Sequence, residues 1–398
     1  MGKTILFCAD GTWNGPRNAN EEDGDAVEDG RTNVYKLFAN LHVQTPADET
    51  AKEQERDLVD AAGRPTGIAK YLHGVGDSGN PVVRVLGGTV GAGLVSRIVR
   101  GYTFVSRNYQ PDDDIILIGF SRGAYTARAL AGMIAAKGVL RLTSAQWANK
   151  DEAYRLGAAV WYDYQAAKQT ATRGGWWSYI AAGAVNFVLD VQATLTRAPH
   201  NNLPVDRIRA VSVWDTVGAL GVPIIRNDTR IDVFGFADTT LSPKVVNGFH
   251  AIALDEQRVD FTPSLWTPDP EKPTRIAQVL FPGAHADVGG GYPMPDPTTP
   301  ARRNECGLSD GALAWMMEQL AGCGVIFALT PPYAPTPDPG AMAHQPWLKT
   351  PYDTGPRHFP ATIGLRLYPS IATRAKAGPV GVDPRVQQGM VYGPMNLP

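Results

Sequence analysis

A serine flanked by glycines, in Gly119-Phe120-Ser121-Arg122-Gly123, is the feature of this chain with the clearest chemical meaning. It follows the apolar run 115–118 and precedes small residues that favour a helix. A Gly-x-Ser-x-Gly motif between a strand and a helix predicts a sharp turn that presents the serine hydroxyl above a parallel sheet. The N–H groups at the start of the helix stabilise negative charge on a substrate oxygen. The motif therefore predicts acyl-transfer chemistry with Ser121 as nucleophile, whereas the alternative is an ordinary turn between a strand and a helix.

A serine nucleophile needs a base, and the base needs an acid that holds its tautomer. His285 follows an apolar run and precedes a glycine-rich loop, so it is the candidate base, although local backbone bonds could also explain it. Asp215 ends another apolar run and is the candidate acid, with a helix cap or a loop organiser as its alternative roles. The order Ser, Asp, His is the order found in α/β-hydrolases. Asp287 is the main alternative acid, and Asp255 is a weaker one.

An oxyanion hole takes one N–H from the residue after the nucleophile, here Arg122, and another from a loop at a neighbouring strand end. By its position that loop is Asp10-Gly11-Thr12, so the N–H of Gly11 or Thr12 is the expected second donor. The Asp10 carboxylate would repel an oxyanion and is expected to point away or to be neutral. A turn-forming role and a cation-ligand role are its alternatives. Asp10 and Asp287 are therefore candidate supporting residues, and the mechanism needs no metal or organic cofactor.

These residues require a mainly parallel sheet whose strands end at one edge, flanked by helices. Apolar runs predict its strands at residues 3–9, 69–75, 115–118, 207–214 and 275–281. Helical spacing of apolar residues predicts flanking helices at 32–42, 94–108, 143–163 and 308–320. Asn33 is the expected cap of the first helix, and the polar residues 45–66 are expected to form a loop. The sequence thus predicts the α/β-hydrolase fold.

The expected organisation is one catalytic domain over residues 1–330, with an insertion at about 141–204, and a proline-rich extension over 331–398. The extension is expected to be irregular and to pack on the domain without a core of its own. Within the insertion, the apolar segment Trp176 to Val191 predicts a core or lid helix, or else a surface that contacts lipid. No run reaches the roughly 18 apolar residues of a membrane span, and the first residues are too short a run for a signal peptide. We therefore expect a cytoplasmic location in the producing cell.

Composition disfavours several other functions. The net charge is −2 and the basic residues are scattered, which argues against nucleic acid as a partner. The three cysteines are far apart and form no metal or redox motif. The glycine-rich stretch 87–93 lacks the Gly-Lys-Ser/Thr ending of a phosphate loop. A metal-assisted phosphoesterase using Asp10 and Asp287, and a binding protein that has lost catalysis, are the alternatives from other classes.

Five motifs in order resemble the DUF2235 family, which includes the catalytic domain of Tle1-type phospholipase effectors of type VI secretion. The motifs are residues 10–14, 119–125, 213–221, 253–258 and 281–292. The resemblance implies an α/β-hydrolase fold and a triad of Ser121, Asp215 and His285. It also implies a lipolytic serine ester hydrolase with a lipid substrate, transient contact with a membrane surface, export by a type VI system and a secretion or immunity partner. A soluble carboxylesterase acting on other esters is the alternative, and the oligomeric state stays open.

Overall fold

The computed structural model describes residues 2–11, 30–74, 90–171, 201–217, 225–226, 229–230, 240–268, 275–293, 305–348, 353–381, 389–394 and 396–397. Thr12, the segment 176–191 and residues 87–89 of the glycine-rich stretch lie outside this part of the chain. Among the described residues, no helix has the length and apolar character needed to cross a membrane.

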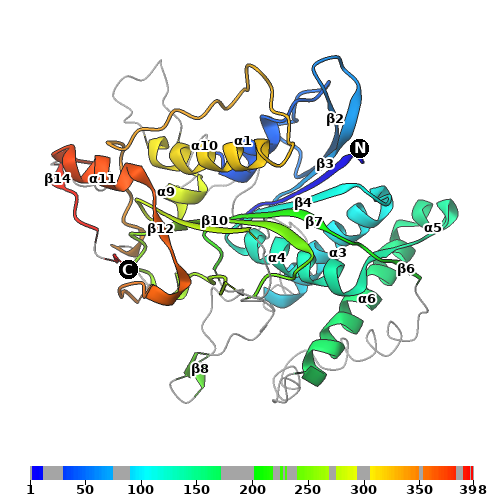
Figure 1. The fold of residues 1–398 in the computed structure, drawn as a ribbon. Helices are drawn as coiled ribbons and strands as arrows, with labels where there is room; N and C mark the ends of the chain where they lie inside the picture. The colour runs from blue at the N-terminus through cyan, green and yellow to red at the C-terminus, as the bar shows by residue number, and fades with distance from the viewer. Residues whose placement is uncertain are drawn as a thin grey trace.

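An eight-stranded sheet forms the centre of the molecule, with helices on both faces (Figure 1). In spatial order its strands are β12 (Arg366–Leu367), β11 (Arg275–Phe281), β10 (Val245–Ala253), β7 (Ile208–Trp214), β4 (Asp114–Phe120), β1 (Thr4–Ala9), β3 (Pro65–Leu72) and β2 (Glu53–Val59). All neighbouring pairs are parallel except β2 and β3, which are antiparallel. The predicted α/β-hydrolase fold, with a mostly parallel sheet between helices, is confirmed.

Side chains alternate between two cores because successive residues of a strand point to opposite faces. Ile115 and Leu117 of β4 join the core that contains α3 (Val90–Asn108), α4 (Arg122–Lys137) and α6 (Lys150–Ala171). Ile116 and Ile118 join the core that contains α1 (Asn33–Ala39) and α10 (Gly307–Ala321). Figure 1 shows these two groups of helices on opposite sides of the sheet. Burial on both faces explains why the central strands read as continuous apolar runs.

The cap of the first helix lies one residue earlier than the sequence predicts. Thr32 is the N-cap of α1, in an extended conformation, and its hydroxyl accepts a hydrogen bond from Tyr35 N at 3.2 Å. The prediction that Asn33 caps this helix is therefore wrong. The Asn33 side chain instead donates to Val288 O at 2.9 Å and to Ser309 O at 2.8 Å. It thereby joins α1 to α10 and to α9 (His285–Gly289).

Two of the longer strands in the main sheet were not expected from the sequence. The predicted loop 45–66 is wrong, because β2 occupies residues 53–59 and pairs with β3 at the edge of the sheet. An edge strand tolerates charged residues on its exposed face, so it shows no apolar run. The second strand, β10, was missed because Asn247, Gly248 and His250 interrupt its apolar residues.

The described ends of the insertion lie together. β5 (Val139–Leu140) leads into α5 (Ser144–Ala148) and α6, and β6 (Asn202–Leu203) returns antiparallel to β5. The remaining short elements are β8 (Ile225–Arg226), β9 (Thr229–Arg230), β13 (Pro379–Val380), β14 (Met390–Val391), η1 (Val259–Phe261), η2 (Pro346–Leu348) and η3 (Ala361–Ile363).

The C-terminal extension is more regular than its composition indicates. It contributes β12 to one edge of the main sheet and is followed by α11 (Pro369–Lys376). Phe359 and Ile371 are buried in a cluster with Leu280 of β11. The extension is therefore part of the packed structure, and it reaches the candidate site described next.

Candidate active site

Ser121 lies in a strained turn between β4 and α4. Its backbone has φ 55° and ψ −124°, a conformation that non-glycine residues rarely adopt. A β-carbon at Gly119 would lie 2.3 Å from Gly123 O, and one at Gly123 would lie 2.1 Å from Ala9 O. Only glycine fits at both positions, as the motif predicts. The Ser121 N–H donates to Trp214 O at 3.1 Å, which fixes the turn beside the end of β7.

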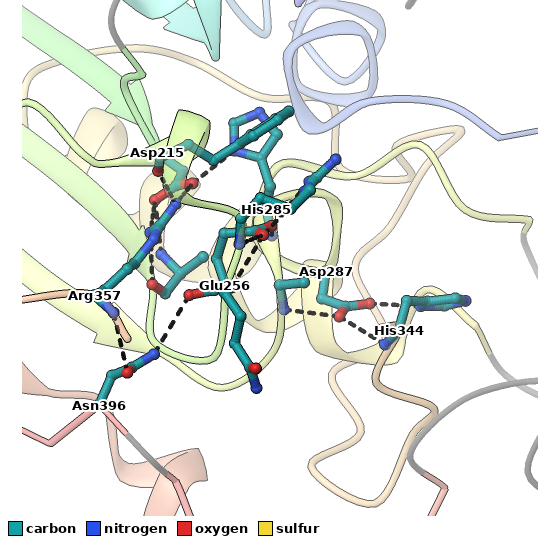
Figure 2. Close-up of polar contacts among 12 residues, drawn as sticks. Asp215, Glu256, His285, Asp287, His344, Arg357 and Asn396 are labelled. Atoms are coloured by element: carbon teal, nitrogen blue, oxygen red, sulfur yellow. Dashed lines mark hydrogen bonds and ion pairs between the residues drawn. The ribbon is translucent and has the colours of Figure 1, made fainter. Parts of the chain in front are cut away.

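Asp215 and His285 are in direct contact (Figure 2). His285 Nδ1 lies 2.6 Å from Asp215 Oδ2, and both side chains are buried. Because the carboxylate accepts the Nδ1 hydrogen, Nε2 remains as the basic nitrogen. Burial lowers the pKa of His285, while its bond to Asp215 works in the opposite direction. The imidazole is therefore neutral at physiological pH, as a general base must be.

His285 lies close to the serine turn. The ring of Phe120, the residue before Ser121, is 4.6 Å from the imidazole centroid. Within the described part of the chain, no hydrogen bond joins the Ser121 hydroxyl to His285. Such contacts in enzymes often tighten only when substrate binds.

Arg357, from the C-terminal extension, completes the surroundings of Asp215 (Figure 2). Its guanidinium donates to Asp215 Oδ1 at 2.7 Å and to Oδ2 at 2.8 Å, and also to Ala253 O and Phe261 O. Burial alone would raise the pKa of Asp215, but the Arg357 charge and hydrogen bonds hold it well below the usual range. Arg357 could not be found from the sequence, because it lies 142 positions from Asp215 in a segment without a motif.

The alternative acid Asp287 contacts a different histidine. Asp287 Oδ1 lies 2.6 Å from His344 Nδ1, and Asp287 Oδ2 accepts hydrogen bonds from the N–H groups of Ala284 and His344. The other nitrogen of His344 lies 3.4 Å from Glu305 Oε2. Burial lowers the pKa of His344, but Asp287 and Glu305 outweigh burial and raise it to about 9. These contacts fix α9, which begins at His285, against residue 344 of the C-terminal extension.

The weaker alternative, Asp255, also binds backbone near His285. Its Oδ2 accepts from Gly283 N at 2.6 Å, and burial raises its pKa to about 6. The next residue, Glu256, accepts from His285 N at 3.1 Å and forms a bidentate ion pair with Arg258. The segment 253–258 thus holds the backbone at Gly283 and at His285, where α9 begins.

Asp10 points into the protein. Its Oδ2 accepts from Tyr71 Oη at 2.6 Å and from Thr32 Oγ1 at 2.8 Å, and its Oδ1 accepts from Gly11 N at 2.7 Å. Burial raises the pKa of Asp10 to about 6, against the effect of these hydrogen bonds. Because Asp10 already accepts the Gly11 hydrogen, the role of Gly11 as an oxyanion donor stays a prediction, as does that of Thr12, which is outside the described residues.

Over the described ranges, no cluster of three or more His, Cys, Asp or Glu side chains has an arrangement suited to a metal ion.

The sheet, the serine turn and the buried Asp-His pair together define a protein of the α/β-hydrolase class. Residues 3–319 match the family model described as type VI secretion phospholipase effector Tle1-like, catalytic domain. The chain belongs to this family.

The chain is similar in sequence to a yeast protein and in structure to solved chains. An uncharacterized protein of Saccharomyces cerevisiae, YEL023C, is 26% identical over 292 residues, which is 68% of this chain and 34% of that protein. A crystal structure of an uncharacterized protein from Pseudomonas aeruginosa has a TM-score of 0.45 and 17% identity, over 95% of this chain and 51% of that chain. A Tle1 effector bound to the VgrG spike of the type VI secretion system has a TM-score of 0.34 and 18% identity, over 73% of this chain and 51% of that chain. The chain thus spans about a third of the curated relative and about half of each solved chain.

Proposed function

We propose that this chain is a serine ester hydrolase that acts on lipids, with Ser121 as nucleophile, His285 as base and Asp215 as the acid that orients it. The observation that carries the proposal is the 2.6 Å contact between His285 Nδ1 and Asp215 Oδ2 beside a serine in an elbow conformation. A buried carboxylate bound to Nδ1 fixes the tautomer in which Nε2 can accept a proton.

The reaction follows from these positions. Ser121 Oγ attacks the acyl carbonyl carbon, and its proton moves to His285 Nε2. The resulting oxyanion is bound by N–H groups at the start of α4, with Arg122 as the first donor and Thr12 or Gly11 as the second. His285 then protonates the departing alcohol, which leaves an acyl-enzyme. Water then gives a proton to His285 and attacks the acyl carbon. As the bond to Ser121 Oγ breaks, His285 returns the proton to Oγ, and the carboxylic acid leaves.

Family membership supports a lipid substrate, because the matched family is described by phospholipase effectors. Two arginines near the nucleophile add support from charge. Arg97 is buried, and among the described residues Nη2 alone of its guanidinium nitrogens has a hydrogen-bond partner, Asp10 O, at 2.5 Å. Arg122 follows the nucleophile directly, and burial lowers the pKa of both arginines to about 10. An anionic phosphate on the substrate would offset the cost of burying these charges.

The test is covalent labelling by a fluorophosphonate, followed by peptide mapping, with the wild type and with Ser121→Ala and His285→Ala. We expect an adduct on Ser121 of the wild type and none on either variant. Hydrolysis of a phospholipid, a neutral diacylglycerol and a short-chain ester then separates lipolytic activity from soluble carboxylesterase activity. Undiminished ester hydrolysis by folded Ser121→Ala would exclude the proposed nucleophile.

The same assay separates the alternative classes. A metal-assisted phosphoesterase would lose activity with a chelator and would not respond to the fluorophosphonate, whereas a serine hydrolase would show the reverse. A binding protein without catalysis would bind lipid vesicles but neither react nor hydrolyse.

Cellular location and partners are proposed on the family description alone. Export by a type VI secretion system, from the cytoplasm of the producing cell, is tested by detecting the chain outside cells with and without that system. Partner proteins are tested by co-purification from the same cells, in which a secretion component or an immunity protein would be recovered. We also propose that residues 1–330 and the extension 331–398 fold as one unit, which a single unfolding transition would support.

A further inference from the structure

Arg357 occupies every remaining hydrogen-bonding position around the Asp215 carboxylate. Asp215 Oδ1 accepts from Arg357 and from Ala253 N at 3.0 Å, and Oδ2 accepts from Arg357 and His285. The Arg357 side chain is 2% exposed and that of Asp215 is fully buried. The contact is therefore a bidentate ion pair away from water, in which geometry is fixed and charge is hardly screened.

This pair changes the charge that His285 experiences. A lone buried carboxylate beside an imidazole favours its protonated form. The positive charge of the Arg357 guanidinium balances the negative charge of Asp215, so the pair is neutral overall. The imidazole then gains less from accepting a proton than it would beside Asp215 alone.

The other groups around His285 do not replace this effect. From the segment 253–258, Glu256 and Arg258 form a second buried ion pair that is also neutral overall. From β4 and η1, the neighbours are the uncharged rings of Phe120 and Phe261, at 4.6 and 5.0 Å between centroids. Among the described residues, Asp215, with its charge balanced by Arg357, is therefore the group that decides the charge at His285 Nδ1.

We infer that Arg357 is a positioning residue through which the C-terminal extension fixes Asp215 and keeps His285 neutral in mildly acidic solution. The inference rests on the proposed function, because it assigns the acid limit of that activity to a residue 38 positions beyond the end of the family match at residue 319. Arg357 does not touch substrate, so it acts only through Asp215.

The test is the pH dependence of kcat/KM and of fluorophosphonate labelling in Arg357→Gln and Arg357→Lys. Glutamine removes the charge, and we expect the midpoint of the acid limb to move upward by roughly one pH unit, with slower turnover at every pH. Lysine keeps the positive charge but cannot form the bidentate contact with Asp215. It should restore the midpoint while turnover stays below that of the wild type.

Arg374→Gln is the matched control. Arg374 is a fully buried arginine of the same extension, and its guanidinium donates to the backbone oxygens of Pro339, Ala341 and Gly381. Its loss should lower thermal stability without moving the acid limb. A midpoint that stays unchanged in Arg357→Gln, with a loss of stability like that of the control, would overturn the inference.

A titration by NMR gives a readout that does not need turnover. The pKa of His285, followed at its Cε1–H and assigned with His285→Gln, should lie below the ordinary value of about 6.5 in the wild type. It should rise in Arg357→Gln and fall back in Arg357→Lys. If the wild type is inactive but these shifts occur, the proposed function fails and the role of Arg357 stands. A wild-type value at or above about 6.5 contradicts the inference even if neither variant folds.

Discussion

Gly289 leaves the space that the ring of Phe120 fills. A β-carbon at Gly289 would lie 1.9 Å from Phe120 Cε2, and the same ring lies 4.6 Å from the imidazole of His285. Phe120 precedes Ser121, so its ring connects the serine turn to α9, the helix that begins with His285. Position 289 therefore affects the relative placement of two proposed catalytic residues.

Gly289→Ala tests that connection. The added methyl group must displace the ring and with it the imidazole, so we expect at least a tenfold loss of fluorophosphonate labelling, since shifts of about 1 Å can cost about 100-fold in rate. Overpacking should also cost about 1–3 kcal/mol of unfolding free energy. Gly311→Ala in α10 is the control, because no described residue, apart from its chain neighbours and the backbone of its own helix, has a heavy atom within 4 Å of the position of an added β-carbon. This variant should be labelled at the wild-type rate, and its free energy of unfolding should rise by about 0.5–1 kcal/mol. Equal labelling of the two variants would show that the ring does not position the imidazole.

Ser121→Gly and Ser121→Ala test the strain in the serine turn. Both variants should be inactive, but glycine adopts φ 55° and ψ −124° without the steric cost that alanine retains. We expect the glycine variant to be more stable than the alanine variant by about 1 kcal/mol, measured by urea unfolding. The reverse order of stability would mean that the turn is not strained.

Glu256→Gln tests the buried ion pair between Glu256 and Arg258, beside His285. Glutamine removes the carboxylate from this buried pair, so the free energy of unfolding should fall by about 3–5 kcal/mol, as for other broken buried pairs. Labelling of Ser121 should also slow, because Glu256 holds the His285 N–H. Glu152→Gln is the matched control, since Glu152 forms a bidentate pair with Arg155 that is partly exposed on α6. Glu152→Gln should lower the free energy of unfolding by less than about 1 kcal/mol. A similar loss in both variants would argue against the burial of the Glu256 pair.

His344 should make stability depend on pH above neutrality. Its pKa is raised to about 9 in the folded protein, above the ordinary value of 6.5. Its stabilising contribution is therefore full below about pH 6.5 and is lost as pH rises through about 9. The full effect is up to about 3 kcal/mol. Urea unfolding from pH 6 to 10 should show this loss in the wild type and not in His344→Gln. Parallel curves for the two proteins would contradict the assignment.

The strands that carry the site were predictable because they are buried on both faces. Residues 208–214 and 275–281 read as apolar runs, and each ends at a polar residue of the candidate triad within a few positions. The glycine spacing around Ser121 was equally informative, because backbone atoms lie where side chains would be. Strand β10 was not predicted, because polar residues interrupt its apolar run. Such residues can be buried only because they bind partners that are distant in sequence. His250, for example, accepts from Thr216 N at 3.1 Å.

The sequence by itself determined the fold class, the serine turn and the order of the candidate residues, because local backbone requirements and burial leave a pattern in neighbouring positions. Tertiary structure alone decided which carboxylate meets which histidine. Asp215 contacts His285 and Asp287 contacts His344, although Asp287 is only two residues from His285. It also decided that Arg357 of the extension pairs with Asp215. Such contacts join residues far apart along the chain, and their geometry depends on how the strands and loops pack, which no local pattern encodes.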